Sequence, residues 1–127
     1  MIQETHKIVE KPWGREIWLA LTDEYCFKRI EIIAGHKTSV QYHERKEETN
    51  FLTEGTAIFY ALNADGQLVG TEVNAGFFVH LPPGVVHAFE AKTDIVLMEA
   101  SNKHVGDVVR LEDDYGRAEI IKACQTG

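Results

Sequence analysis

The sequence predicts an all-β fold, either a sandwich or a barrel of short strands. The apolar segments are short and rich in β-branched and aromatic side chains. Glycine, proline and aspartate separate these segments at intervals of roughly 8–12 residues, a spacing typical of all-β sandwiches and barrels. Only one stretch, near the C-terminus, has a clear helical pattern. The balance of signals therefore favours strands throughout most of the chain.

The predicted strands, in chain order, span residues 15–21, 25–33, 56–62, 67–73, 77–81, 88–91 and 95–100. Asn, Asp and Gly in residues 63–66 are the residues of a hairpin turn, so the third and fourth strands should pair. Pro82, Pro83 and Gly84 end the fifth strand. Residues 118–123 are expected to form a short helix that caps the barrel.

Length and charge limit the classes of function. The 127 residues suit a single domain, residues 1–127, and the net charge of -7 disfavours nucleic acid or an anionic membrane as a bulk partner. The N-terminus lacks the pattern of a signal peptide, and no apolar run approaches the ~18 residues of a membrane span, so we expect a cytoplasmic protein. Cys26 and Cys124 are then expected to be reduced thiols, with a disulfide between them as the alternative.

Four polar residues form the candidate site: Gln41, His43, Glu48 and His87. Gln41 and His43 are two residues apart, so on a strand both side chains point to one face. Glu48 follows a turn, where a returning strand can bring it alongside, and a barrel would place His87 opposite the first pair. Each residue taken alone would more often be an ordinary hydrogen-bonded polar residue. Together they suit one divalent ion of Mn, Fe, Co, Ni or Zn, with two open positions on an octahedral ion.

The spacing of these residues resembles the two sequence motifs of the cupin superfamily. The first motif is matched by Gly35, Gln41, His43, Glu48 and Gly55, with Gln in place of the usual first His. The second is matched by Gly76, Pro82, Gly84 and His87, with Ala91 in place of the usual closing Asn. The resemblance implies a double-stranded β-barrel, or jelly roll, with one metal ion held by Gln41, His43, Glu48 and His87.

Further segments are similar to the type II mannose-6-phosphate isomerase domain, which in many bacterial proteins is the C-terminal part of a bifunctional mannose-1-phosphate guanylyltransferase. The resemblance covers residues from about 9 to 117. The segments that carry it are Lys-Pro-Trp-Gly at 11–14, Gln-Tyr-His at 41–43, Pro-Pro-Gly-Val-Val-His at 82–87, and residues 109–117, which end in Glu-Asp-Asp-Tyr-Gly-Arg. It implies an aldose–ketose isomerase that acts on a sugar or sugar phosphate in the supply of polysaccharide precursors.

Such a reaction needs a base that moves a proton between two carbons of the sugar. Glu44, Glu47 and Glu99 are the candidates, and Glu99 has the advantage of ending an apolar strand, where burial would raise its pKa. Arg117 matches the Tyr-Gly-Arg ending of the family and is a further catalytic candidate. The candidates for contacts with the sugar or its phosphate are Trp13, Lys28, Lys46 and Arg110, together with Lys11.

Two other functions stay open on the sequence. One is a non-catalytic cupin that binds a carbohydrate, and the other is a metal-dependent cupin oxygenase. In each case the expected partner is a small molecule, and we expect a homodimer because an unpaired sheet edge favours pairing with a second copy.

Overall fold

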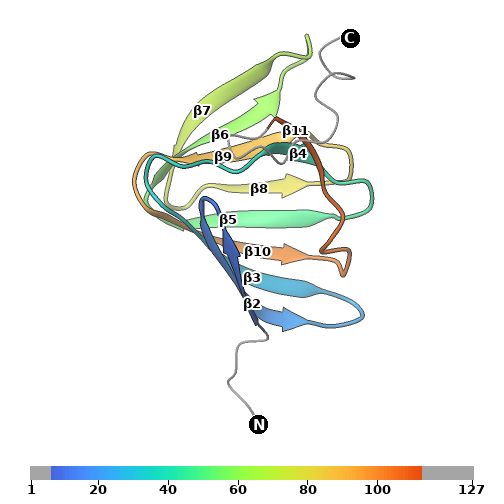
Figure 1. Ribbon diagram of the computed structural model, residues 1–127. Helices are drawn as coiled ribbons and strands as arrows, with labels where there is room; N and C mark the ends of the chain where they lie inside the picture. Colours follow the sequence, from blue (N-terminus) through green and yellow to red (C-terminus); the bar gives the residue numbers. More distant parts are fainter. Residues whose placement is uncertain (1–6, 113–127) are drawn as a thin grey trace.

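The computed structural model describes residues 7–112 and contains two antiparallel β-sheets (Figure 1). The six-stranded sheet has the order β1-β2-β3-β10-β5-β8, and the five-stranded sheet has the order β11-β4-β9-β6-β7. The strands are β1 (Lys7–Lys11), β2 (Gly14–Leu21), β3 (Cys26–Ile32), β4 (Val40–Tyr42), β5 (Glu48–Glu54), β6 (Thr56–Leu62), β7 (Leu68–Asn74), β8 (Phe78–Leu81), β9 (His87–Ala91), β10 (Ile95–Ser101) and β11 (Val109–Glu112). Residues 7–112 include no helix, so the all-β prediction is confirmed.

The seven predicted strands correspond to β2, β3, β6, β7, β8, β9 and β10, with ends that differ by one residue at most. The strands without predicted bounds are β1, β4, β5 and β11. The predicted helix at 118–123 lies outside the described residues, as do Arg117 and Cys124. Cys26 is buried and has no disulfide partner within residues 7–112. No helix within residues 7–112 is long and apolar enough to cross a membrane.

The interior of the barrel is built in layers by the two-residue period of its strands. On β3, β5 and β10, side chains alternate between the interior and the outer surface. Leu97 of β10 lies opposite Ile30 of β3 and Leu52 of β5, and these three belong to the hydrophobic core. Two residues further along β10, Glu99 lies opposite Lys28 and Asn50. Two residues along each strand therefore separate an apolar layer of the interior from a layer of charged and polar side chains.

The five-stranded sheet contributes the opposite wall. Gln41 of β4 pairs with His87 of β9 on one side and with Arg110 of β11 on the other. Among the connections between strands, Gly55 requires glycine, because its φ of 90° lies in the left-handed region and a Cβ there would be 2.3 Å from the carbonyl oxygen of Asp94. The two sheets thus place polar residues from β3, β4, β5, β9 and β10 around one cavity.

Candidate metal centre

Three buried side chains converge inside the barrel: His43, Glu48 and His87. His43 directly follows β4, whereas Glu48 and His87 are the first residues of β5 and β9. Nε2 of His43 is 3.3 Å from Oε1 of Glu48, and Nε2 of His87 is 3.2 Å from the same oxygen. Potential ligand atoms of the three residues lie within 4.8 Å of one another. The barrel therefore assembles three of the four predicted ligands.

Backbone carbonyls fix the orientation of both imidazoles. Nδ1 of His43 is 2.5 Å from the carbonyl oxygen of Asp107, and Nδ1 of His87 is 2.9 Å from that of Val85. A carbonyl oxygen only accepts hydrogen bonds, so each Nδ1 carries a hydrogen, and in the neutral imidazole the lone pair lies on Nε2, where it can bind a metal. Metal-binding histidines in proteins have this arrangement, in which the second ring nitrogen donates to a carbonyl or carboxylate.

These atoms converge as the ligands of one cation would. Two imidazole lone pairs and a carboxylate oxygen repel one another, and Nε2 of His43 is buried without a hydrogen-bond partner among residues 7–112. Atoms that share one ion at about 2.1 Å lie about 3.0–3.4 Å apart when the angle between them is near 90–110°. The two measured distances fall in this range. The cluster can therefore hold a metal ion, and two imidazoles with one carboxylate suit a divalent transition metal.

Gln41, the fourth predicted ligand, lines the same cavity but has a different partner. Its Oε1 accepts a hydrogen bond of 2.6 Å from the hydroxyl of the buried Ser39. Its strand position opposite His87 keeps the amide beside the three-residue cluster.

A chain of buried ion pairs extends from Glu48 into the cavity. Nζ of Lys46 is 2.9 Å from Glu48 and 3.0 Å from Glu99. Lys28 in turn lies 3.8 Å from Glu99 and 3.3 Å from Glu16. Acidic and basic side chains thus alternate from the three-residue cluster to the wall formed by β2.

Burial and the neighbouring charges together set the pKa values of these groups. Burial, reinforced by the charge of Glu48, raises the pKa of Glu99 to about 7, although Lys46 and Lys28 oppose the shift. Burial alone would raise the pKa of Glu48, but the two adjoining imidazoles and Lys46 hold it below its usual range. Burial alone would lower the pKa of Lys46, but the carboxylates of Glu99 and Glu48 outweigh burial, and the pKa lies above its ordinary value. Lys46 is therefore a permanent cation that both carboxylates share.

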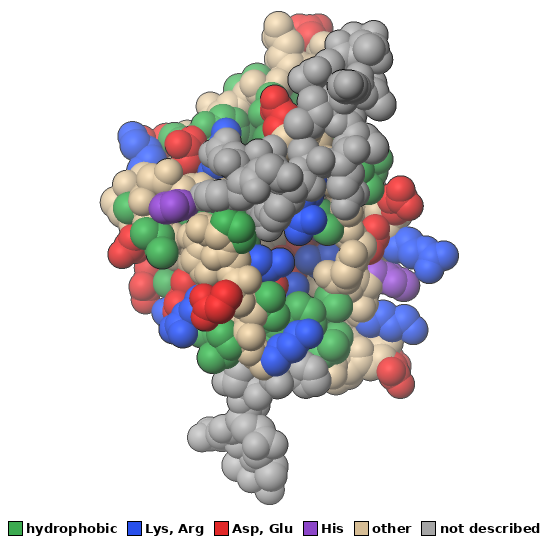
Figure 2. Space-filling view, viewed as in Figure 1, with side chains coloured by type: hydrophobic (Ala, Val, Ile, Leu, Met, Phe, Trp, Pro, Cys, Tyr) green, Lys and Arg blue, Asp and Glu red, His purple; other side chains and the backbone are tan. Residues whose placement is uncertain are grey.

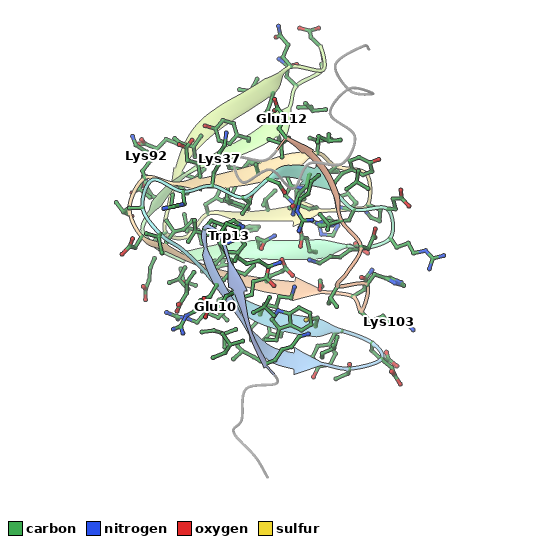
Figure 3. All side chains as sticks on the ribbon, in the orientation of Figure 1. Glu10, Trp13, Lys37, Lys92, Lys103 and Glu112 are labelled. Atoms are coloured by element: carbon green, nitrogen blue, oxygen red, sulfur yellow. The ribbon has the colours of Figure 1, made fainter. Side chains whose placement is uncertain are left out.

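The cavity has a volume of about 110 Å³. Figure 2 shows Lys and Arg side chains gathered around a hollow in the middle of this face. The predicted residues that line the cavity are Lys11, Trp13, Lys28, Lys46, Glu99 and Arg110. Trp13, at the turn between β1 and β2, is buried in the interior (Figure 3).

Two of the predicted substrate contacts, Lys28 and Lys46, already form ion pairs with carboxylates of the protein. Nε of Arg110, by contrast, is buried without a hydrogen-bond partner within the described part of the chain.

Two of the candidate bases lie away from the cavity. Glu47 is 55% exposed and pairs with Nε2 of His80 at 3.0 Å on the outer surface, and Glu44 is exposed. Of the three candidate bases, the structure therefore brings only Glu99 to the cavity.

Two residues of the site were not found from the sequence. Glu16 of β2 accepts hydrogen bonds from Lys28 and from Nε1 of Trp18. Asp107 accepts hydrogen bonds from the backbone of residues 44–46, and these bonds lower its pKa more than burial raises it. Asp107 lies in a loop without periodicity, and its partners are more than 60 residues away, so no local pattern marks it.

Comparisons with known proteins identify the family of this chain. Residues 1–119 match the family described as mannose-6-phosphate isomerase C-terminal. The mannose-1-phosphate guanylyltransferase ManC of Salmonella typhimurium is 32% identical over 117 residues, which cover 88% of this chain and 23% of the relative. The xanthan biosynthesis protein XanB of Xanthomonas campestris is also 32% identical over 117 residues, covering 88% of this chain and 24% of the relative. The chain thus spans about a quarter of the length of these relatives.

Solved structures support the fold. An RmlC-like cupin from Shewanella frigidimarina superposes with a TM-score of 0.66 at 22% identity, over 79% of this chain and 85% of that one. The two-sheet barrel, the matched family and the order of the motifs lead to one assignment. The chain has a cupin fold and belongs to the mannose-6-phosphate isomerase C-terminal family.

Proposed function

We propose that this domain is a metal-dependent aldose–ketose isomerase that acts on a sugar phosphate, with mannose 6-phosphate as the first substrate to test. One observation carries the proposal: the His43, Glu48 and His87 cluster opens onto a cavity that also holds a buried carboxylate, Glu99. The family match and a relative named as a xanthan biosynthesis protein support this choice of substrate class. Phosphorylated sugars do not cross membranes unaided, so this activity implies a cytoplasmic location.

The residues of the cavity suit the proton transfer that isomerisation requires. A divalent ion bound by the cluster, with Gln41 as a further ligand, would supply polarisation of the carbonyl and hydroxyl oxygens at C1 and C2. In this proposal Glu99 takes the proton from C2 of the open-chain aldose and returns it to C1, while a proton moves from O2 to O1. Lys46 contacts both Glu48 and Glu99, so it offsets the negative charge of the base without consuming a ligand atom.

Cationic side chains on the wall suit the phosphate. Lys11 and Arg110 line the cavity, and the unpartnered Nε of Arg110 can donate to a phosphate oxygen. Trp13 provides an apolar wall beside them. Arg117 remains a candidate for the same role on family resemblance alone.

The test combines metal analysis with turnover. We expect about one divalent ion per chain by elemental analysis, and interconversion of mannose 6-phosphate and fructose 6-phosphate that a chelator abolishes. His43→Ala should lose the metal, and Glu99→Gln should keep the metal but lose turnover by about 10²–10⁴-fold, the contribution typical of a general base. Glu47→Gln is the matched control, because Glu47 is a nearby carboxylate outside the cavity. A protein that cannot be loaded with any divalent ion would refute the proposal.

A second function is favoured by one feature of the cluster. Two histidines and one carboxylate with open positions form the ligand set of non-haem iron oxygenases. Oxygen consumption by the Fe(II)-loaded protein, without isomerisation of any sugar phosphate, would favour this alternative. Binding of sugars without turnover or oxygen consumption would favour the non-catalytic carbohydrate-binding function instead.

We also propose that the domain forms a homodimer through a sheet edge. β7 is an edge of the five-stranded sheet, and its residues Leu68 and Val69 are exposed. Figure 1 shows the β6–β7 hairpin extending beyond the rest of the barrel. Light scattering coupled to size exclusion measures the mass, and Val69→Lys should shift a dimer toward the monomer.

A further inference from the structure

The loop between β10 and β11, residues 102–108, is hydrogen-bonded to the turn that follows β4. The backbone N–H of Asn102 donates to the carbonyl of Glu47 at 3.1 Å, and its side-chain amide donates to the carbonyl of Arg45 at 3.0 Å. Val105 and Val108 of this loop line the cavity. The loop therefore lies directly against the segment that carries His43, Lys46 and Glu48.

Asp107 makes most of the contacts between the two segments. One carboxylate oxygen accepts hydrogen bonds from the backbone N–H groups of Arg45 and Lys46, at 2.5 and 2.9 Å. The other accepts from the N–H of Glu44 at 3.2 Å. The backbone carbonyl of the same residue accepts from Nδ1 of His43. Asp107 thus contacts the turn with its side chain and the imidazole with its main chain.

These two contacts are made by the same residue. The carboxylate fixes the position of Asp107 against residues 44–46, and that position brings its carbonyl to His43. If the carboxylate is lost, the carbonyl is free to move away, and Nδ1 of His43 loses the acceptor that fixes its hydrogen. The imidazole can then rotate or change tautomer, and its Nε2 no longer presents a lone pair toward Glu48 and His87.

We propose that Asp107 is the positioning residue of the metal centre, which acts through the 44–46 turn to hold His43 in its metal-binding orientation and tautomer. The inference rests on the proposed metal centre. Partners that orient a ligand from outside the coordination sphere typically change metal affinity by about 10–100-fold when removed. We therefore expect an effect of that size from loss of the carboxylate.

Metal affinity is the first measurement. The dissociation constant for Co²⁺ and Zn²⁺ is measured by competition with a chromophoric chelator for the wild type, Asp107→Ala and Asp107→Asn. Asp94→Ala is the matched control, because Asp94 also accepts a backbone hydrogen bond across a loop, from Ala34 at 2.8 Å, outside the cavity. We expect Asp107→Ala to bind about 10–100-fold more weakly. Asp107→Asn keeps one acceptor oxygen and should lie between, while the folded Asp94→Ala protein should bind as the wild type does.

The state of His43 in the metal-free protein is the second measurement. Long-range ¹H–¹⁵N spectra separate the two imidazole tautomers, and the His43 signals are assigned by their absence in His43→Gln. The wild type should show the Nδ1–H form, and Asp107→Asn should show a mixture of tautomers. This measurement needs no metal and remains available if Asp107→Ala fails to fold.

The outcomes separate the two proposals. Wild-type protein that binds metal tightly, together with Asp107 variants that match its affinity and its His43 tautomer, would refute the role of Asp107 alone. Equal weakening in Asp94→Ala would also refute it, because the effect would then be general destabilisation. Wild-type protein that binds no divalent ion would refute the proposed function and this inference together.

Discussion

Replacing Glu99 with glutamine should change how the stability of the metal-free protein depends on pH. Burial and the charge of Glu48 raise the pKa of Glu99 from 4.5 to about 7 in the folded protein. In the unfolded chain the carboxyl group loses its proton near the ordinary value. Between these two values the folded state binds a proton that the unfolded state does not. The free energy of unfolding must therefore fall as the pH rises through this window, and level off above it.

The two pKa values set the size of the effect. A difference of about 2.5 between them corresponds to about 3 kcal/mol in total, at about 1.4 kcal/mol per pKa unit. Of this, about 2–3 kcal/mol falls between pH 5 and pH 8. Glutamine has nearly the same shape and cannot ionise. The stability of Glu99→Gln minus that of the wild type should therefore rise by about 2–3 kcal/mol over this range.

Urea denaturation at half-unit steps from pH 5 to pH 8, in excess chelator, measures the difference directly. Glu47→Gln is the control, because its carboxylate is 55% exposed and pairs with His80 on the surface. Its difference from the wild type should change by less than about 1 kcal/mol. A Glu99→Gln difference that stays flat across the range would refute the reasoning.

Three further measurements test the barrel and its metal centre. Leu97→Ala should lower the free energy of unfolding by about 2–5 kcal/mol, because Leu97 is 2% exposed in the core, whereas Leu19→Ala on the outer surface should change it far less. Gly55→Ala should destabilise the fold by about 1–3 kcal/mol or more through its positive φ and the clash with Asp94, and Gly66→Ala, which has a positive φ but open space, by less. A divalent ion at 100 times its dissociation constant should raise the free energy of unfolding by about 2.7 kcal/mol, and chelator should reverse the gain.

The sequence was sufficient for most strands because their alternation reflects burial on one face. β6 begins and ends at the predicted residues, and β10 ends one residue beyond its prediction. β4 is three residues long, too short for a periodic pattern, and its place is set by pairing with β9 and β11. Its existence could be inferred only from the need to place Gln41 and His43 on one face.

The candidate ligands could be predicted because their chemistry and spacing are both distinctive, whereas their partners could not. Lys28 and Lys46 were predicted as substrate contacts, and a sequence does not show that each is buried between carboxylates. The partners come from strands distant in the chain, as with Lys28 and Glu99, which are 71 residues apart and directly opposite across β3 and β10. Asp107 acts on backbone groups, which every residue has, so the sequence gives no indication of its partners.

The layer of charged residues next to the core, formed by Lys28 and Glu99, is better explained by a role in the site than by a contribution to fold stability. Buried ion pairs rarely stabilise a fold more than apolar side chains of similar size, because both charges lose their hydration. Positions 28 and 99 face the interior just as Ile30 and Leu97 do two residues away on the same strands, so apolar side chains would fit there equally well. Instead, a lysine and a carboxylate occupy these positions, and a second lysine joins that carboxylate to Glu48. This arrangement keeps a buried carboxylate beside three converging ligand atoms, with its charge offset by fixed cations, as the proposed isomerisation would require.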